Sequence, residues 1–508
     1  MGPDGYINPY DNVRNTSLSA EFRCLTNGLL LEHGKSLLGA LAHYNLEAMQ
    51  AGEKEYWQKL AENGGPRTAD EWEGLLQYCA QDVDAEVRLF LHLAPRIPLS
   101  QALVRGHYTK TVAQVEATGI PIDQPLYHTI LEQWEPLKQA LITRKNPDFG
   151  CPYDAEGHFR HAALLRWADT QGIAWPRTTK GLAVLEKEDL KDLALLYPQL
   201  EPFRQLRKTL GQMRATGFPV GADGRNRFLL WPFGTKTGRN APGTSANIMG
   251  TAAWLRFLIQ APEGYGLAYV DWAQQEYGIA AALSHDKGMQ LAYLSGDPYI
   301  ALARMARAVP VWATKDSHGK VRDRYKTVSL GVLYGMRGPS LARRLDLSLG
   351  EGEQLLADHE QAFPTYWAWN KETVLHALLA RRMSTVLGWH LHCGPWAEQN
   401  KRSISNFPMQ GNGSEMLKLA SCLTLEAGVT ICALVHDALL ILAPLADLPD
   451  AIATTQRCMA EASRYILKGF ELASEVHIFT HPYHYFDKRG VDMWKEVRDI
   501  LGQQLFLA

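Results

Sequence analysis

The spacing of apolar and polar positions predicts a mostly helical chain with a few short strands. Amphipathic helices are expected at residues 35–60, 70–93, 124–145, 160–170, 183–217 and 339–381. Strand-like apolar runs are rare, and the clearest of them end in, or flank, an acidic residue. The polar residues within these few elements are therefore the first candidates for chemistry.

One helical segment, residues 322–335, carries four side chains at intervals of four. Arg322, Lys326, Leu330 and Tyr334 drift by only about 40° per step, so they form one stripe along the helix. The stripe runs from two cations through an apolar residue to a ring. The cations suit a phosphate chain, and the apolar end suits the sugar and base of the same nucleotide. An amphipathic helix with solvated basic residues is the other interpretation of this segment alone.

Two aspartates lie on strand-like runs far apart in the sequence. A short apolar run at 267–270 leads into Asp271, and a helical pattern follows it. Two further apolar runs flank His436 and Asp437, as in a hairpin with polar residues at its turn. A charge in apolar surroundings is costly unless a partner or a metal neutralises it. Each aspartate alone could be a strand-end cap or a salt-bridge partner, but together they are suited to a two-metal phosphoryl-transfer site with ions about 3.5–4 Å apart.

With these three segments in place, the sequence resembles the family-A DNA polymerases. Residues 271–276 resemble the family's motif A, Asp-Tyr-Ser-Gln-Ile-Glu. Residues 322–335 resemble motif B, and residues 436–438 resemble motif C, His-Asp-Glu. The motifs stand in the family's order, and the resemblance covers roughly residues 70–508.

The resemblance implies an α+β, right-hand polymerase fold, in which a palm with an antiparallel sheet lies between helical fingers and a helical thumb. A partial, exonuclease-like helical region would precede it. The expected parts are a partial 3′-5′ exonuclease-like region at 1–95, a connector at 96–125, the thumb and start of the palm at 126–250, the palm with motif A at 251–290, the fingers at 291–380, and the palm with motif C and the C-terminus at 381–508.

The resemblance also implies catalytic roles. Asp271 and Asp437 would hold two Mg²⁺ ions, with Mn²⁺ as an alternative and the backbone carbonyl of Trp272 as a further ligand. One ion would lower the pKa of the primer 3′-hydroxyl and the other would neutralise the triphosphate and the leaving pyrophosphate. Arg322 and Lys326 would bind the β- and γ-phosphates, with Lys326 as proton donor to pyrophosphate.

The nucleotide pocket follows from the same resemblance. Leu330 and Tyr334 would pack against the incoming nucleotide and its templating base, and Gln274 would belong to this pocket. Glu276 would be a steric gate, because its side chain below the sugar, paired with Tyr334, leaves no room for a 2′-hydroxyl. Tyr299 stands where the family often has a phosphate-contacting histidine.

Contacts to the primer-template are implied at several further residues. Arg239 belongs to a segment that resembles the family's Thr-x-Thr-Gly-Arg, whose arginine reaches the minor groove, where a guanidinium can bond acceptors common to all base pairs. The other expected contacts are Thr237, Asn247, Asn406, Gln410 and His436. A helix N-cap is the alternative interpretation of Asn406.

Two positions depart from the family pattern. Leu330 replaces an aromatic residue, which removes a ring edge from the sugar pocket. Ala438 replaces the acidic residue that usually follows the catalytic aspartate. That acidic residue is a secondary carboxylate, so activity is expected to survive.

The N-terminal part resembles only one motif of a proofreading exonuclease. Tyr78 and Asp82 match its Tyr-x3-Asp motif, but no upstream Asp-x-Glu strand and no second aspartate motif precede them. One carboxylate does not assemble a two-metal site, so we expect no proofreading. An ordinary helix surface explains these two residues equally well.

Composition limits the function further. A net charge of −2 does not indicate a nucleic-acid binder, but residues 201–244 hold eight Lys and Arg against two acidic residues, and 320–344 hold seven against one. Such local patches suit a DNA track. The seven cysteines show no metal-binding spacing. There is no apolar run of about 18 residues and no signal-peptide pattern, so we expect a cytoplasmic monomer of a bacterial or phage-infected cell, with primer-template DNA and dNTPs as partners and no membrane.

Three alternatives stay open. A single-subunit RNA polymerase shares the aspartates and the cationic stripe but should lack a bulky gate at Glu276. A nuclease would rest on Asp82. A non-catalytic relic that binds primer-template would not require the acidic and basic site residues, all of which are present.

Overall fold

The computed structural model describes residues 17–47, 51–212, 218–243 and 246–502. Its centre is a four-stranded antiparallel sheet with the strand order β6-β7-β3-β8. The strands are β3 (Tyr265–Trp272), β6 (Thr430–Val435), β7 (Ala438–Pro444) and β8 (Ser474–Thr480). The expected hairpin is confirmed as β6 and β7, and the 267–270 run is confirmed as part of β3.

The two faces of this sheet contribute to different cores, because successive side chains of a strand point to opposite faces. Ala268, Val270 and Trp272 of β3 belong to one core, together with residues of the helix α20 (Leu448–Ile466), which packs against β3, β7 and β8. Leu267 belongs to the second core, with Tyr269 packed against it from a partly buried position. Asp271 follows them on this second face, where the strand ends.

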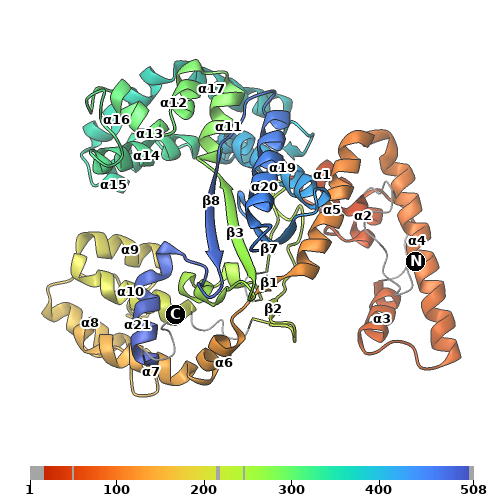
Figure 1. Cartoon of the computed structure of the whole chain (residues 1–508), viewed down its shortest axis with the longest axis horizontal. Coiled ribbons are helices and arrows are strands. Elements are labelled where there is room, and N and C mark those ends of the chain that lie inside the picture. The colour runs from red at the N-terminus through yellow and green to blue at the C-terminus, as the bar shows by residue number, and fades with distance from the viewer. Residues whose placement is uncertain (1–16, 48–50, 213–217, 244–245, 503–508) are drawn as a thin grey trace.

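A helical lobe lies at one end of the sheet, at the top of Figure 1. It contains α11 (Gln275–Ser284), α12 (Lys287–Leu294), α13 (Pro298–Met305), α14 (Gly319–Leu333), α15 (Gly338–Leu345), α16 (Leu349–Ala362) and α17 (Pro364–Ala380). We call it the upper lobe. The expected stripe helix is α14, and it packs against α11, α13, α15 and α16. Trp367 and Trp369 are partly buried against the core.

A second helical lobe lies at the opposite end of the sheet and is called the lower lobe (Figure 1). Its elements are α6 (Gln124–Glu132), α7 (Trp134–Lys145), η2 (Asn146–Phe149), α8 (His161–Thr170), α9 (Lys187–Leu196), η3 (Pro198–Leu200), α10 (Glu201–Gln212) and α21 (Val491–Leu501). The helix expected at 183–217 is interrupted at Tyr197 and Pro198, where η3 begins. Residues 213–217 of the helix expected at 183–217 lie outside the described residues.

The N-terminal region forms a third part, beside the sheet and away from both lobes (Figure 1). It contains α1 (Leu18–Thr26), α2 (Leu37–His43), α3 (Ala51–Glu62), α4 (Ala69–Leu93) and η1 (Ala94–Arg96). The helix expected at 70–93 is α4, which begins with a capping box between Thr68 and Glu71. The single helix expected at 35–60 is wrong, because α2 ends at His43.

The connector expected at 96–125 holds a long helix, α5 (Leu99–Thr118). Pro98 stands at its N-cap, and Gly119, with φ of 66°, stands at its C-cap. Pro98 and Gly119 therefore mark the two ends of a helix and do not mark a linker. The helix α5 packs against β6 and against α19 (Lys401–Glu426), so it is part of the core around the sheet.

The remaining elements are short. They are β1 (Ile120–Pro121), β2 (Arg225–Asn226), η4 (Ile248–Gly250), η5 (Ala253–Leu258), β4 (Arg382–Ser384), β5 (His390–His392), α18 (Trp396–Gln399) and η6 (Lys488–Gly490). β4 and β5 pair as an antiparallel hairpin. All seven cysteines are free. Among the described residues, no helix is both long and apolar enough to cross a membrane.

Candidate active site

The sheet register decides what stands beside Asp271. Its direct partner on β7 is Ala438, and its direct partner on β8 is Glu475. Directly opposed residues of antiparallel strands point to the same face. The position that lacks the family's usual carboxylate therefore lies on one side of Asp271, and a different carboxylate lies on the other.

The two aspartate motifs meet at the end of the sheet. The amide of Trp272 donates to the backbone carbonyl of Asp437 at 3.4 Å, so the turn between β6 and β7 lies next to the end of β3. His436 has φ of 53° and Gln274 has φ of 44°, both in the left-handed region. Non-glycine residues adopt this region at a cost that the surrounding structure must offset. Such strain on both sides of one carboxylate pair is typical of a functional site.

Both carboxyl groups are poorly solvated. Burial, together with the charges of Asp437 and Glu475, raises the pKa of Asp271 to about 7. Burial also raises the pKa of Asp437. The Oδ1 atom of Asp271 is buried without a hydrogen-bond partner. An electron-rich oxygen in this condition is suited to accept a cation.

The cationic stripe of α14 faces these aspartates across one pocket of about 490 Å³. A volume of this order suits a ligand of nucleotide size. The pocket is lined by Arg239, Asp271, Trp272, Ala273, Gln274, Gln275, Glu276, Tyr277, Tyr299, Arg322, Lys326, Leu330, Tyr334, His436, Asp437 and Glu475. One pocket thus brings together many of the residues that the sequence analysis singled out. They are the four stripe residues, both aspartates, Arg239, Trp272, Gln274, Glu276 and His436.

The two cations differ in how firmly they are held. The Nε atom of Arg322 donates to Asp297 at 2.5 Å, and Asp297 also caps the start of α13. The guanidinium lies 5.2 Å from the centre of the Tyr299 ring, and the Lys326 ammonium lies 6.0 Å from it. Tyr299 is buried, and burial raises its pKa to about 12. A neutral ring therefore lies beneath both cations.

A second group of contacts surrounds Glu276. Its carboxylate accepts a hydrogen bond from the Tyr334 hydroxyl at 2.9 Å and lies 3.8 Å from the Arg239 guanidinium. The amide of Gln410 donates to the same hydroxyl at 3.4 Å. Burial raises the pKa of Glu276. Four predicted site residues are thus connected in one network.

Two residues that were expected to contact DNA are instead buried inside the protein. Asn247 is 4% exposed, and its side chain accepts from the amide of Met249 as the cap of η4. Asn406 is 5% exposed and lies inside α19, where its amide donates to the carbonyl of Leu333 at 3.1 Å. Neither side chain is presented for DNA in this structure, and the N-cap interpretation of Asn406 is also wrong. Asn406 instead ties α19 to the end of α14.

The other expected DNA contacts remain accessible. His436 is exposed at the hairpin turn, and Gln410 is partly exposed. Thr237 is also partly exposed, with its hydroxyl 3.1 Å from that of Thr235. Arg239 follows two residues later in the same loop.

Sequence reasoning missed Glu475 and Asp297. Glu475 belongs to no recognised motif, and only the pairing of β8 with β3 brings it beside Asp271. Asp297 did carry a local signal, because an aspartate before a proline at a helix start is a good N-cap. Its bond to Arg322 joins residues 25 positions apart and was not readable from the sequence.

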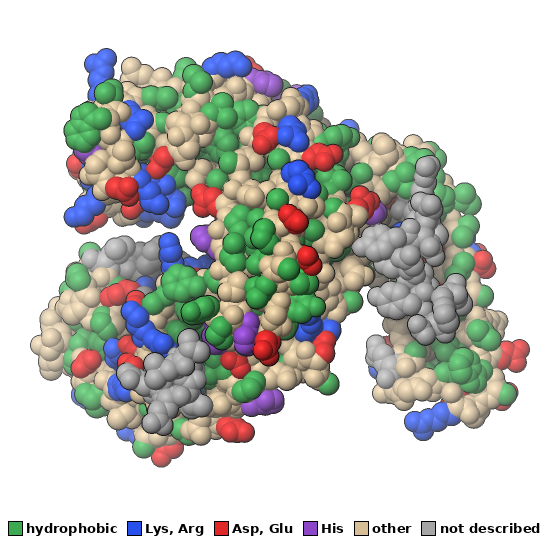
Figure 2. Space-filling model, in the orientation of Figure 1, with side chains coloured by type: hydrophobic (Ala, Val, Ile, Leu, Met, Phe, Trp, Pro, Cys, Tyr) green, Lys and Arg blue, Asp and Glu red, His purple; other side chains and the backbone are tan. Residues whose placement is uncertain are grey.

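The surface around the site is hollowed and basic. Figure 2 shows a hollow between the upper and lower lobes, with Lys and Arg side chains gathered on the edge of the upper lobe that faces it. The helices on this edge, α14 and α15, carry Lys320, Arg322, Arg324, Lys326, Arg343 and Arg344. A basic edge along a hollow suits a phosphate backbone.

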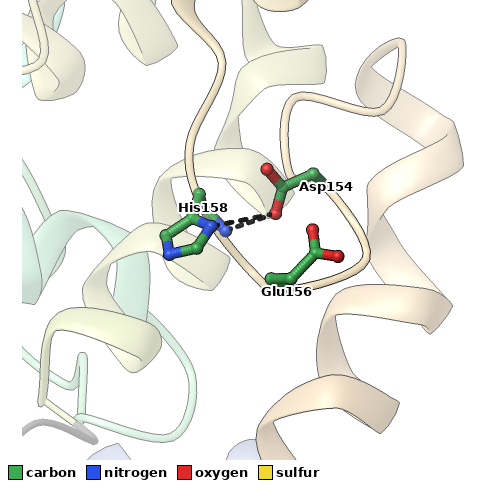
Figure 3. A group of neighbouring side chains, drawn as sticks. All are labelled: Asp154, Glu156 and His158. Atoms are coloured by element: carbon green, nitrogen blue, oxygen red, sulfur yellow. Dashed lines mark hydrogen bonds and ion pairs between the residues drawn. The ribbon is translucent and has the colours of Figure 1, made fainter.

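Asp82 and the exonuclease-like region form no comparable site. Among the described residues, the one group of three or more close metal-ligating side chains is Asp154, Glu156 and His158, in a loop of the lower lobe (Figure 3). Asp154 there accepts from the His158 amide at 2.7 Å and pairs with Arg160 at 3.3 Å. These bonds explain the conformation of the loop without a bound ion.

A comparison with solved structures identifies the fold. The polymerase domain of Pol1 from M. smegmatis, solved in complex with DNA primer-template and dNTP, matches 91% of this chain and 81% of its own with a TM-score of 0.70 and 20% identity. An antiparallel sheet between two helical lobes, with paired aspartates at its end, together with this likeness defines a right-hand polymerase fold. The expected fold class is confirmed.

Sequence comparisons give the family. Residues 244–478 match the family model for DNA polymerase family A. A thermostable DNA polymerase I of Thermus filiformis is 26% identical over 407 residues, which are 74% of this chain and 48% of that protein. DNA polymerase I of Chloroflexus aurantiacus is 23% identical over 435 residues, 78% of this chain and 45% of the relative. Residues 244–478 therefore form a DNA polymerase family A domain, and the chain spans about half or less of the length of these curated relatives.

Proposed function

We propose that this protein is a template-directed DNA polymerase that adds dNTPs to a primer 3′-hydroxyl. One observation carries the proposal: Asp271 and Asp437 line the same pocket as Arg322 and Lys326, which lie on a different part of the chain. Carboxylates opposite paired cations are suited to transfer of a phosphoryl group from a polyphosphate. The family membership supports the same reaction.

The carboxylates fit the divalent cations that such a reaction requires. Asp271 offers a buried oxygen without a partner, and its pKa is raised by burial and by two neighbouring negative charges. We propose that Asp271 and Asp437 hold two Mg²⁺ or Mn²⁺ ions, with the Trp272 carbonyl and Glu475 close enough to assist. When bound, the ions supply charge neutralisation and activation of the primer hydroxyl.

The cations of α14 would bind and orient the triphosphate. Arg322 is already directed by Asp297, so it loses little freedom when a phosphate binds. Lys326 is exposed on the pocket wall, and its ammonium can donate a proton to the leaving pyrophosphate. Leu330 and Tyr334 continue the wall where the sugar and base would lie.

Glu276 would select deoxyribose. Its carboxylate is fixed by Tyr334 and partly neutralised by Arg239, so it stays in place below the sugar. A 2′-hydroxyl would need to displace a partly buried, hydrogen-bonded group. We propose that Gln410, which is bonded to the same tyrosine, contacts the primer-template together with Arg239, Thr237 and His436.

The primer-template would lie in the hollow between the lobes. The basic edge formed by α14 and α15 would neutralise part of the backbone (Figure 2). We further propose a monomer located in the cytoplasm and without proofreading, because Tyr78 and Asp82 match the one exonuclease motif recognised in this sequence. We propose that the upper lobe acts as the fingers expected at 291–380 and that the lower lobe acts as the thumb expected at 126–250.

The test is extension of a labelled primer on a longer DNA template with Mg²⁺ and either dNTPs or rNTPs. The variant Asp437→Ala should abolish growth, and Asp450→Ala, an exposed aspartate of α20, should leave it intact. Growth with dNTPs only, lost in Asp437→Ala, is the expected result. Tight primer-template binding without growth would replace the proposal by a binding relic, and growth with rNTPs would favour an RNA polymerase.

A further inference from the structure

The first helix of the chain is attached to the polymerase core, although the sequence groups it with the exonuclease-like region. The helix α1 packs against α4, but also against α5 and β5. It is followed by Asn27 and Gly28, which contact the β4–β5 hairpin. This hairpin in turn lies under the loop that carries Arg239, residues 233–240, which we call the Arg239 loop.

Asn27 joins three segments with one side chain. Its amide nitrogen donates to the carbonyl of Lys236 at 2.6 Å and to the carbonyl of His390 at 2.7 Å. Its backbone carbonyl accepts from the amide of His392 at 2.8 Å. Asn27 is only 2% exposed, so its amide is largely shielded from water, where the loss of a hydrogen bond is costly.

A buried ion pair fixes α1 in this position. Glu21 and Arg105 form a two-pronged pair with both distances at 2.7 Å, and both side chains are buried. Arg105 also donates to the carbonyl of Leu387, in the turn between β4 and β5. Because a buried charge is stable only with its partner, this pair holds α1, α5 and the hairpin in one arrangement.

The hairpin supports the Arg239 loop directly. The indole of Trp389 donates to the Lys236 carbonyl at 3.0 Å, which is the same oxygen that Asn27 binds. Its ring stacks on Phe233 with centroids 5.4 Å apart. Gly238 has φ of 74°, and a Cβ there would lie 3.0 Å from the Lys418 ammonium, so the loop is seated closely on buried side chains.

The orientation of the Arg239 side chain depends on these contacts of the Arg239 loop. Its guanidinium lies 3.8 Å from Glu276, and its Nε atom is buried without a partner. The loop turns back through the amide of Thr235, which donates to the Arg239 carbonyl at 3.2 Å. A shift of the Lys236 carbonyl would therefore move Arg239 relative to the gate.

We propose that residues 17–28 act as a clamp that positions Arg239, and through it Glu276, for primer-template binding and sugar selection. The clamp rests on the proposed polymerase function. It assigns a role in the polymerase reaction to an N-terminal segment more than 200 positions before Arg239 in the sequence. Asn27 is a positioning residue in this account, because it contacts the loop and neither DNA nor nucleotide.

The test uses Asn27→Asp in the full chain, because a carboxylate of the same shape does not donate to the two carbonyls. Primer-template affinity is measured by fluorescence anisotropy, and sugar selection by the ratio of kcat/KM for dNTP and rNTP. The expected change is a loss of about 3–10-fold in each, the equivalent of one or two hydrogen bonds. Asn370→Asp, which alters an amide tie between α17 and Ser405, is the matched control and should lower Tm without these changes.

A double variant separates positioning from stability. If Asn27 acts through Arg239, Asn27→Asp combined with Arg239→Ala should discriminate no worse than Arg239→Ala alone. Additive losses, or losses no larger than those of Asn370→Asp, would overturn the clamp. Should Asn27→Asp fail to fold, Trp389→Phe removes the other donor to the Lys236 carbonyl, together with part of the ring that stacks on Phe233, and decides the question in the same assays. Wild-type protein without primer extension would instead contradict the proposed function.

Discussion

The hydroxyl of Tyr334 donates to the carboxylate of Glu276 at 2.9 Å, joining the end of α14 to the start of α11. The bond connects the stripe helix of the upper lobe to a residue that follows the strand carrying Asp271. It fixes a side chain that would otherwise have several rotamers. Sugar selection should therefore depend on this pair as a unit.

Removing the gate should relax sugar selection. Glu276→Ala opens space below the sugar, so the ratio of kcat/KM for dNTP over rNTP should fall by about 100-fold or more, as expected when a steric barrier of a few kcal/mol is lost. Tyr334→Phe keeps the ring and loses only the hydrogen bond, so its ratio should fall by about 3–10-fold. Unchanged selection in both variants would show that Glu276 is not the gate.

The pair of Arg322 and Asp297 should control nucleotide binding. Asp297→Asn keeps a good helix cap for α13 but removes the charge that directs Arg322, so KM for dNTP should rise several-fold with a smaller change in kcat. The matched control is Asp323→Asn, because Asp323 contacts the same guanidinium from an exposed position at 3.3 Å. Exposed ion pairs contribute little, so its KM should be near that of the wild type. Equal effects of the two variants would contradict this account.

Glu475 should contribute to cation binding. Because it is the direct cross-strand neighbour of Asp271, Glu475→Gln should weaken Mn²⁺ binding by about 3–10-fold, measured by electron paramagnetic resonance without substrate. The exposed Glu461 of α20 provides the control Glu461→Gln, which should bind Mn²⁺ as the wild type does. Identical affinities in both variants would exclude Glu475 from the site.

Metal-free stability should fall as pH rises, because of Asp271. Its folded-state pKa of about 7 lies above the ordinary value of 3.8, so between these values the folded protein binds more protons than the unfolded chain. Below this window the Asp271 carboxyl group is neutral in both the folded and the unfolded chain. Above it the carboxyl group is charged in both, and burial makes that charge unfavourable in the folded protein. Asp271→Asn should therefore raise Tm at pH 8 but not at pH 4.

The expected gain for Asp271→Asn is about 1–2 kcal/mol at pH 8, after discounting for the partial exposure of the carboxyl group. Thermal unfolding in the presence of a chelator measures it. The exposed Asp450→Asn is the control and should show no pH-dependent gain. A gain of equal size at both pH values would assign the effect to something other than titration.

Local patterns identified the catalytic strand, the hairpin and the stripe helix. Intervals of four residues put Arg322 and Tyr334 on one face of α14, and apolar runs on both sides of His436 gave β6 and β7. These features depend on periodicity within a segment, which packing did not override. The helix α5 was not predicted within the connector expected at 96–125, because Pro98 and Gly119, which are its caps, are also typical of linkers.

Asn247, Asn406 and Glu475 show that local sequence patterns carry no information about contacts between distant segments. Two asparagines expected on DNA are buried in bonds to backbone groups, and their sequences carry no sign of the segments that cover them. Glu475 became a neighbour of Asp271 only through strand register. A shift of one residue in that register would turn the side chain to the other face of the sheet.

The sequence by itself determined the family, the order of the motifs and most of the residues that line the pocket, because each motif encodes its own helix or strand. Tertiary structure alone decided which polar side chains are exposed and which are used in packing. It also brought Asn27 under the Arg239 loop and Asp297 to Arg322. Contacts between distant segments depend on how whole elements pack, and no local spacing records that arrangement.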